Sequence, residues 1–300
     1  MRYVKTIASK LDATLKYIFK TEDNLIVEFS YINKDDGKDI ICISCQTMCN
    51  IGCKFCHTTD YIGKIKLRNL SVYEMYEGVL YIYKNQDLES KNRTLLVSFM
   101  GCGEPILNVK EVVDTMHSIK NSIEMRTPLT RFAVATCLPK NNWVSFFEMT
   151  ERIKDLKLQV KLHLSLHYTI DIIRKEWMPR SLDIMSSLSA VDFYKKVTGN
   201  AVEIHYALLE GVNDTEQDAI LMANFLKDKD INVKFLFYNE KDSLSVKASS
   251  KEKLKNFKTY FNTYGIDHEY YIPPGLDIGA SCGQFLMDYY LEESKKTSGG

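Results

Sequence analysis

The sequence predicts an α/β fold whose parallel sheet forms an open or partial barrel of six strand–helix units. Six short segments are rich in Val, Ile, Leu and Phe, which is typical of strands that are buried on both faces. Segments of helical length separate them, and this alternation indicates parallel strands joined by right-handed crossovers. The predicted strands are residues 39–44, 94–100, 131–137, 158–166, 201–209 and 232–238.

The segments between these strands carry helix signals. "SVYEMYEGVLYIYKN" has apolar residues at helical spacing, and Ser71 is suited to cap its N-terminus. In "DTEQDAILMANFLKD", either Asp214 or Thr215 can take the same role. We expect three parts along the chain: a short extension of one helix and one strand (1–37), the barrel core (38–290) and a disordered tail (291–300).

The composition excludes several classes of protein. Three hundred residues, 45% hydrophobic and 26% charged, are enough for one large globular α/β domain. Lys and Arg total 39 and Asp and Glu total 39, and this balance argues against bulk attraction to nucleic acid. No signal peptide and no window of the ~18–20 apolar residues that a membrane span needs is present. We therefore expect a cytoplasmic protein whose eight cysteines are reduced or bind a metal.

Residues able to do chemistry follow the predicted strands. "GCGEP" (101–105) comes after the second strand, "SLH" (165–167) ends the fourth and "EGVND" (210–214) follows the fifth. A cluster of cysteines follows the first strand. The carboxyl ends of parallel strands share one face, where barrels of this kind build their active sites. The sequence therefore predicts one shared site.

The cysteine cluster has the spacing of a metal centre. Cys49, Cys53 and Cys56 form a C-x3-C-x2-C motif. Three thiolates on such a loop can hold three irons of a [4Fe–4S] cluster and leave the fourth iron open. Zinc is an alternative, but "CISC" and "CKFC" are only seven residues apart, fewer than a zinc ribbon uses. Unmetallated thiols are the third interpretation.

Together these motifs carry a family resemblance. With Phe55 just before the third cysteine and "GCGEP" at the second strand, the chain resembles the radical S-adenosylmethionine (SAM) superfamily. From about Glu28 to Phe285, it resembles more narrowly the RlmN/Cfr family of adenine methyltransferases of ribosomal and transfer RNA. The motifs shared in the same order are "CISCQTMCNIGCKFCHTTDYIGKIKLRNLS", "FMGCGEPILN", "LSLH", "MP", "EGVND" and "DIGASCGQF".

The resemblance implies a fold, an activity and cofactors. The fold is a partial (β/α)6 TIM-like barrel of the radical SAM type. The activity is methylation of an sp2 carbon, with adenine in RNA as the expected substrate. The cofactors are SAM and a [4Fe–4S] cluster held by Cys49, Cys53 and Cys56. We also expect a monomer and an electron donor such as flavodoxin or ferredoxin.

The resemblance also implies three catalytic residues. In this family, one SAM methylates a cysteine, here Cys282, and a second SAM is cleaved at the cluster to a 5′-deoxyadenosyl radical. That radical removes hydrogen from the methyl group, and the resulting carbon radical adds to the substrate ring. Cys42 then resolves the adduct by forming a disulfide with Cys282, and Glu28 accepts the proton. Judged alone, Cys282 is more often a buried structural thiol, and the alternative for Glu28 is an outward-facing strand residue.

Cofactor binding is assigned by the same resemblance. A carboxylate and an amide at strand ends suit the ammonium and ribose hydroxyls of SAM. Judged alone, His167 is more often a structural histidine. The residues that the resemblance implies are Gly103, Glu104, Ser165, Leu166, His167 and Asn213.

The chain departs from the family pattern at several positions. Ala135 stands where the family has a serine that contacts the cofactor, and Cys45 replaces a serine, adding a thiol that could compete for disulfide exchange or cluster iron. Only about forty residues precede the cluster, so the family's RNA-binding N-terminal helical domain is largely absent. Candidate phosphate contacts remain at Lys64, Lys66 and Arg68.

Two other functions stay open at this point. The same chemistry directed at a peptide or small molecule suits a neutral, shortened chain. A non-enzymatic iron–sulfur or zinc protein is the alternative of another class, but it leaves "GCGEP", "SLH" and Cys282 unexplained.

Overall fold

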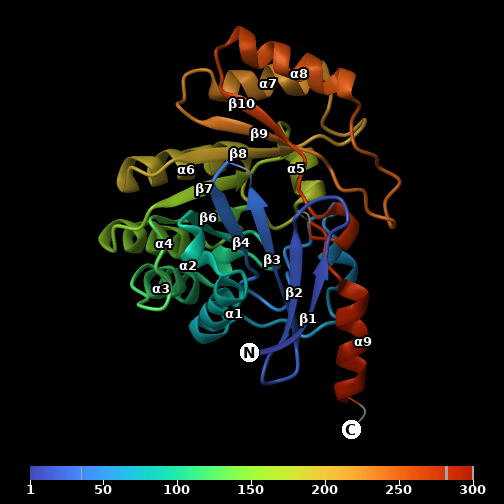
Figure 1. Ribbon diagram of the computed structural model, residues 1–300. Helices are drawn as coiled ribbons and strands as arrows, with labels where there is room; N and C mark the ends of the chain where they lie inside the picture. Colours follow the sequence, from blue (N-terminus) through green and yellow to red (C-terminus); the bar gives the residue numbers. More distant parts are fainter. Residues whose placement is uncertain (35, 281–282, 299–300) are drawn as a thin grey trace.

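The computed structural model describes residues 1–34, 36–280 and 283–298, and the strands of this part form one ten-stranded sheet (Figure 1). Each strand pairs with its neighbour in chain order, antiparallel from β1 to β4 and parallel from β4 to β10. The strands are β1 (Arg2–Ala8), β2 (Leu15–Lys20), β3 (Ile26–Lys34), β4 (Lys38–Cys42), β5 (Thr94–Phe99), β6 (Thr130–Thr136), β7 (Val160–Ser165), β8 (Val202–Ala207), β9 (Asn232–Leu236) and β10 (His268–Tyr271).

The predicted α/β class and parallel sheet are confirmed. The six predicted strands correspond to β4 to β9, with small differences at their ends. Figure 1 shows α1, α3, α4 and α6 along the outer face of the sheet. The helices are α1 (Val72–Asn85), α2 (Leu88–Lys91), α3 (Val109–Lys120), α4 (Trp143–Asp155), α5 (Asp171–Trp177), α6 (Ile184–Thr198), α7 (Glu216–Leu226), α8 (Lys251–Thr263) and α9 (Met287–Ser298).

Both expected N-caps can be compared with the structure. Ser71 caps α1 through a capping box with Glu74, as predicted. Thr215, rather than Asp214, caps α7. The Asp214 carboxylate instead accepts hydrogen bonds from the Gly211 amide at 2.9 Å and from Lys253 at 2.9 Å.

Alternate residues of the parallel strands face opposite sides, and this alternation positions the site. In β7, Val160, Leu162 and Leu164 enter the main hydrophobic core, which lies between the sheet and the outer helices. His163 and Ser165 of the same strand line hollows inside the barrel. The period of two along a strand therefore separates an apolar outer face from a polar interior face.

The N-terminal extension differs from the prediction. Residues 1–34 form three antiparallel strands, not one helix and one strand. Between β1 and β2, the Ser9 hydroxyl accepts a hydrogen bond from the Leu11 amide, and Asp12 Oδ1 accepts one from the Thr14 amide. Such local side-chain bonds favour a turn over a helix. A second turn, at Asn24 (φ 63°), lies between β2 and β3.

The C-terminal tail is also different from the prediction. Residues 291–298, expected to be disordered, belong to α9, which starts at Met287. Met287 and Tyr290 are buried in a small cluster with Ile18 and Ile26 of the N-terminal strands. This apolar contact, which tail composition alone does not reveal, stabilises the helix. Within the described residues, no helix is long and apolar enough to cross a membrane.

Candidate functional site

The three predicted cluster ligands lie together at the carboxyl end of the parallel strands. Cys49, Cys53 and Cys56 line one hollow with about 1070 Å³ of empty space. Gly103 and Glu104, which follow β5, line the same hollow. The loop after β4 and the turn after β5 therefore meet as the strand-end argument predicted.

The thiols have the chemistry of a metal-binding set. Burial and the neighbouring Cys56 raise the pKa of the Cys49 thiol to about 12. Burial also raises the pKa of Cys53 and Cys56, and neighbouring thiols add to the effect at Cys53. A cationic centre stabilises thiolates and reverses such shifts, because metal binding displaces their protons. The donor set therefore fits a [4Fe–4S] cluster with three protein ligands.

The cysteine loop is held in place by backbone contacts. The Lys54 amide donates to the Trp177 carbonyl at 2.8 Å, and the Thr59 hydroxyl donates to the Cys53 carbonyl at 2.6 Å. The Lys241 ammonium, itself paired with Asp60 at 2.8 Å, donates to the Lys54 carbonyl. These contacts fix the curl that brings the three sulfur atoms to one hollow.

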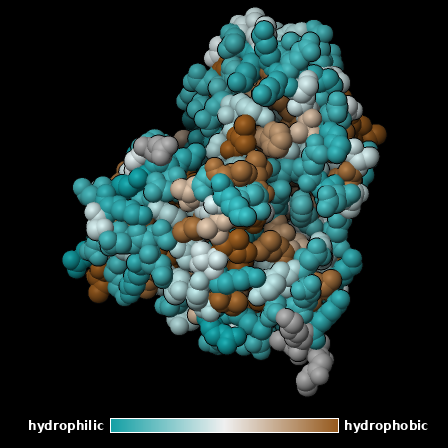
Figure 2. Space-filling view, turned by 45° about the vertical axis from the view of Figure 1, so that its right-hand side comes forward, coloured by the Kyte–Doolittle hydropathy of each residue, from teal (hydrophilic) through white to brown (hydrophobic). Residues whose placement is uncertain are grey.

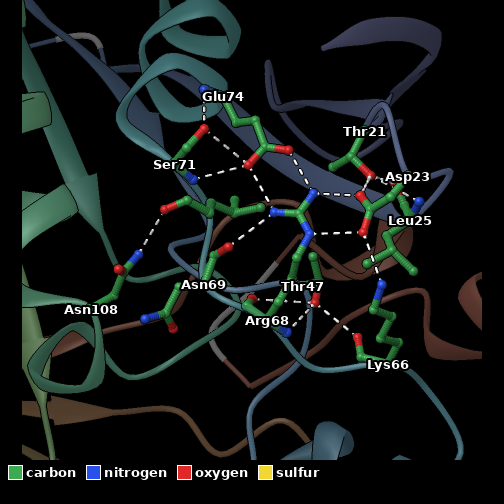
Figure 3. Close-up of polar contacts among 11 residues, drawn as sticks. Thr21, Asp23, Leu25, Thr47, Lys66, Arg68, Asn69, Ser71, Glu74 and Asn108 are labelled. Atoms are coloured by element: carbon green, nitrogen blue, oxygen red, sulfur yellow. Dashed lines mark hydrogen bonds and ion pairs between the residues drawn. The ribbon is translucent and has the colours of Figure 1, made fainter.

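Arg68 anchors the chain on either side of this loop (Figure 3). Its guanidinium makes paired hydrogen bonds to the carboxylates of Asp23, in the β2–β3 turn, and Glu74, in the first turn of α1. The Arg68 amide donates to the Thr47 hydroxyl at 3.0 Å, just before Cys49. Arg68 was a candidate phosphate contact, but its charge is already balanced by two carboxylates. Lys66 also contacts Asp23, at 3.3 Å.

The turn after β5 places a fixed carboxylate in the hollow. Gly103 has φ +114°, and a Cβ there would lie 2.7 Å from Cys45 Sγ, so only glycine fits. Glu104 accepts hydrogen bonds from the amides of Ile106 and Cys137, both at 3.1 Å. Burial raises the pKa of Glu104, and the hydrogen bonds only partly oppose this rise. A buried carboxylate is stabilised by a nearby positive charge, so an ammonium partner would be strongly favoured.

The turn after β7 contributes Ser165 and His167 to the same hollow. His167 has a left-handed backbone (φ 56°), and its Nδ1 accepts from the Ala207 amide at 3.0 Å. Burial, with smaller contributions from His205 and Arg174, lowers the pKa of His167 well below its usual value. The ring is therefore neutral, with its proton on Nε2 as an available donor.

Two predicted cofactor residues lie outside the lining of this hollow. The Asn213 amide donates to the carbonyls of His167 (2.6 Å) and Ala207 (2.7 Å) and accepts from the Leu209 amide (2.7 Å). The Leu166 side chain is buried in the main core. Both residues thus shape the turn after β7 and do not face the hollow.

Glu28 and Cys42 line a second hollow of about 990 Å³, deeper in the barrel. Glu28 faces this interior, not the solvent, and pairs with Lys16. Its Oε1 accepts a hydrogen bond from the Leu286 amide at 3.0 Å. The two hollows share lining residues, including Met100 and His205, so they lie next to each other.

Cys282 lies outside the described residues, and so does its predicted disulfide with Cys42. The residues flanking it can be placed. Ala280 lines the second hollow, and Gly283 lines the first. The Gly283 carbonyl accepts a hydrogen bond from the His57 amide at 3.0 Å, next to the last cluster cysteine.

The two positions that depart from the family pattern have different surroundings. Cys45 is only 2% exposed, belongs to the main core and packs behind Gly103. Burial raises its pKa well above the usual value, which keeps the thiol protonated. Because Cys45 lines neither hollow, it is poorly placed to compete for iron or disulfide exchange. Ala135 lines the first hollow, where its small side chain leaves space.

Sequence reasoning missed one buried charge that supports the site. Arg174 of α5 is 1% exposed and donates to the carbonyls of Ser165, Leu166 and Cys137. It thereby ties the ends of β6 and β7 together. An arginine in "DIIRKEW" looks like a solvated helix residue, so no local signal identifies it.

The surface agrees with an interior site. Figure 2 shows a mostly hydrophilic face on which hydrophobic side chains gather in a hollowed band across the middle, below α7 and α8.

Comparisons with known proteins agree with this description of the site. No protein-family model matches the chain. It is 32% identical over 295 residues to the probable dual-specificity RNA methyltransferase RlmN of Carboxydothermus hydrogenoformans, covering 97% of this chain and 81% of that protein. It is also 32% identical over 285 residues to the protein of the same name from Lachnoclostridium phytofermentans, covering 94% and 75%.

Solved structures give a matching result. A radical SAM methyltransferase from Sphaerobacter thermophilus superposes with a TM-score of 0.82 at 28% identity, over 94% of this chain and 80% of that one. Streptococcus suis SuiB bound to S-adenosylmethionine has a TM-score of 0.55 at 12% identity, over 81% of this chain and 52% of that one, a likeness of fold alone.

Proposed function

We infer the activity from one premise: the chain belongs to the RlmN family of radical SAM methyltransferases. It is a radical SAM C-methyltransferase that uses a [4Fe–4S] cluster and SAM. When bound, these groups supply an electron, a methyl group and a carbon-centred radical, which permit alkylation of a ring carbon that is a poor nucleophile. The chain's own residues supply position, charge and proton transfer.

We propose that Cys49, Cys53 and Cys56 hold the cluster and that Gly103, Glu104, Ser165 and His167 contact SAM. One observation carries this assignment: all seven residues line the same hollow. The Glu104 carboxylate suits the SAM ammonium, and the neutral His167 ring offers a hydrogen-bond donor. Leu166 and Asn213 support the turn that presents Ser165 and His167.

We further propose that Cys282 carries the methyl group, with Glu28 and Cys42 acting on the substrate adduct. The support is proximity. Glu28 and Cys42 line the deeper hollow, and the described residues nearest to Cys282 in the chain, Ala280 and Gly283, lie one at each hollow. Glu28 accepts the proton that the substrate ring carbon loses. The Cys42 thiolate bonds to the Cys282 sulfur as the bond between that sulfur and the transferred carbon breaks, and the product leaves with the electron pair.

The proposed substrate is an adenine of RNA. The support is that the relatives at 32% identity are named RNA methyltransferases. We also propose that the chain acts as a monomer and receives electrons from a small carrier such as flavodoxin or ferredoxin.

Single variants of the two thiols test this function. Anaerobically purified wild-type protein should carry a methyl group on Cys282, seen by peptide mass spectrometry, and should methylate adenine in transfer RNA or ribosomal RNA fragments. Cys282→Ala should lose methyl transfer but keep the cluster. Cys42→Ala should stall with RNA covalently attached, because nothing releases the adduct.

Cys102→Ala is the matched control, because Cys102 is buried but lines neither hollow. It should still methylate RNA. Free turnover by Cys42→Ala without an adduct contradicts the role of Cys42. Methylated Cys282 with no transfer to any RNA redirects the substrate to a peptide or small molecule.

A further inference from the structure

Three buried side chains that are not part of the cysteine loop converge in the barrel interior. His163 of β7 pairs in register with Glu203 of the neighbouring β8, and His205 follows two residues later on the same face. Their exposed fractions are 5%, 3% and 6%. The mechanism above uses none of the three.

The ligand atoms of this triad form a small triangle. His163 Nδ1 lies 2.8 Å from His205 Nε2 and 3.0 Å from Glu203 Oε1, and the third side, His205 Nε2 to Glu203 Oε1, is 3.4 Å. Ligand atoms about 2.1 Å from one ion lie about 3.0 Å apart at right angles and about 3.4 Å apart in a tetrahedron. The observed triangle matches one face of such a coordination sphere.

Protons alone do not satisfy this triangle. If one proton lies between two of the three ligand atoms, the third atom still directs a lone pair at a lone pair of one of the other two. Protons on both ring nitrogens instead oppose two N–H groups across 2.8 Å. Among the described residues, the buried Glu203 Oε1 receives no hydrogen bond of normal geometry, and its cationic neighbour is the Lys234 ammonium at 2.7 Å. A cation in the middle satisfies all three sides at once.

The charges around Glu203 permit such a cation. Lys161 contacts Oε2, so Oε1 is the oxygen that faces the two rings. Lys234 lies 2.7 Å from Oε1, but it also pairs with Glu269 at 2.8 Å. Lys234 therefore keeps a partner if an ion replaces it at Glu203.

We propose that His163, Glu203 and His205 bind one divalent first-row transition-metal ion, separate from the iron–sulfur cluster. Two imidazoles and one carboxylate are ligands that suit Zn²⁺, Fe²⁺ or Co²⁺. Both imidazoles line the deeper hollow with Glu28 and Cys42. Open coordination positions of the ion therefore face this hollow and can hold an oxygen or ring nitrogen of the substrate.

The test is Zn²⁺ binding to the complete holoenzyme. With the cluster in place, the cysteine loop does not compete for zinc. Isothermal titration with ZnCl₂ should show one ion per chain, and zinc-edge X-ray absorption should show nitrogen and oxygen ligands without sulfur. Added zinc should also raise the unfolding temperature, because an ion that binds only the folded state stabilises it.

Two variants and one control complete the test. Glu203→Gln, which keeps the side-chain volume, should weaken zinc binding at least tenfold, and the double variant His163→Ala with His205→Ala should abolish it. His117→Ala removes an exposed imidazole from α3 and should bind zinc like the wild type. Absence of binding by the wild type, sulfur ligands in its spectrum, or unchanged affinity in Glu203→Gln would each overturn the proposal.

Discussion

Gly103 lies in the turn after β5, against the loop that follows β4. A Cβ at this position would lie 2.7 Å from Cys45 Sγ and 2.8 Å from Gln46 Cβ. Gly211, in the turn after β8, also has a positive φ (+69°), but nothing lies within 4 Å of its built Cβ. The two glycines thus separate the cost of backbone strain from the cost of a steric clash.

Gly103→Ala should therefore destabilise the protein more than Gly211→Ala. We expect a loss of about 2–4 kcal/mol in the free energy of unfolding for Gly103→Ala, because strain and overpacking add. Gly211→Ala should lose about 1 kcal/mol from strain alone. Denaturant unfolding measures both values. Adding Cys45→Ala to Gly103→Ala should recover part of the loss, and equal losses in the two single variants would contradict the clash.

Arg68 joins three elements that are remote in sequence: the β2–β3 turn, the start of the cysteine loop and the start of α1 (Figure 3). Its hydrogen bonds are the largest influence on the pKa of Asp23, which they hold well below its ordinary value. A lowered carboxyl pKa stabilises the folded state above the unfolded pKa of 3.8, and this stability is lost as the pH falls further.

Arg68→Met should lower the free energy of unfolding by about 1–2 kcal/mol at neutral pH, a value already discounted for the partial exposure of Asp23. The loss should shrink as the pH falls below about 4, because the unfolded chain then binds a proton at Asp23 that the folded wild-type protein does not bind. Lys66→Met should change stability by less than about 0.5 kcal/mol, since its ion pair is exposed. Denaturant titrations at pH 7 and near pH 3 measure the free energy of unfolding of each protein. An equal loss for Arg68→Met at both pH values would contradict a stabilising Arg68–Asp23 ion pair.

At the scale of elements, the sequence predicted what depends on apolar composition and strand-end position. The strands β4 to β9 and the shared hollow of Cys49, Cys53, Cys56 and Glu104 follow from these two signals. The ion pair of Arg68 could not be predicted from these signals, because its partner Asp23 is 45 residues away in the chain.

The polar interior was present in the sequence but was overlooked. In "VKLHLS" and "VEIHYA", polar residues alternate with apolar ones, and this period of two marks a strand with one polar face. Because these segments were interpreted as strands buried on two apolar faces, the triad of His163, Glu203 and His205 was not predicted. The short β10 pairs with β9, from which α8 separates it along the chain, and local composition does not encode such a pairing.

At the scale of the whole molecule, the last helix completes the N-terminal strands. Tyr290 of α9 is 2% exposed and packs with Ile18 and Met48, which lies one residue before Cys49. The helix therefore connects the end of the chain with both the extension and the start of the cysteine loop.

Tyr290→Ala should cost about 3 kcal/mol in the free energy of unfolding, because it leaves a cavity beneath α9. Glu292→Ala, on an exposed position of the same helix, should change stability by less than about 0.5 kcal/mol. Thermal and denaturant unfolding compare the two. A Tyr290→Ala protein as stable as Glu292→Ala would show that α9 is not a fixed part of the fold.

The wall of the deeper hollow comes from both ends of the chain. Ser9 donates to Asp277 at 2.7 Å, the Gly275 amide donates to Asp12 at 2.8 Å, and Lys16 contacts the Gly279 carbonyl. A ribosome adding 5–20 residues per second needs roughly 14–54 s to pass from Ser9 to Gly279. During that interval this wall of the deeper hollow stays open, because its C-terminal partners have not yet been made.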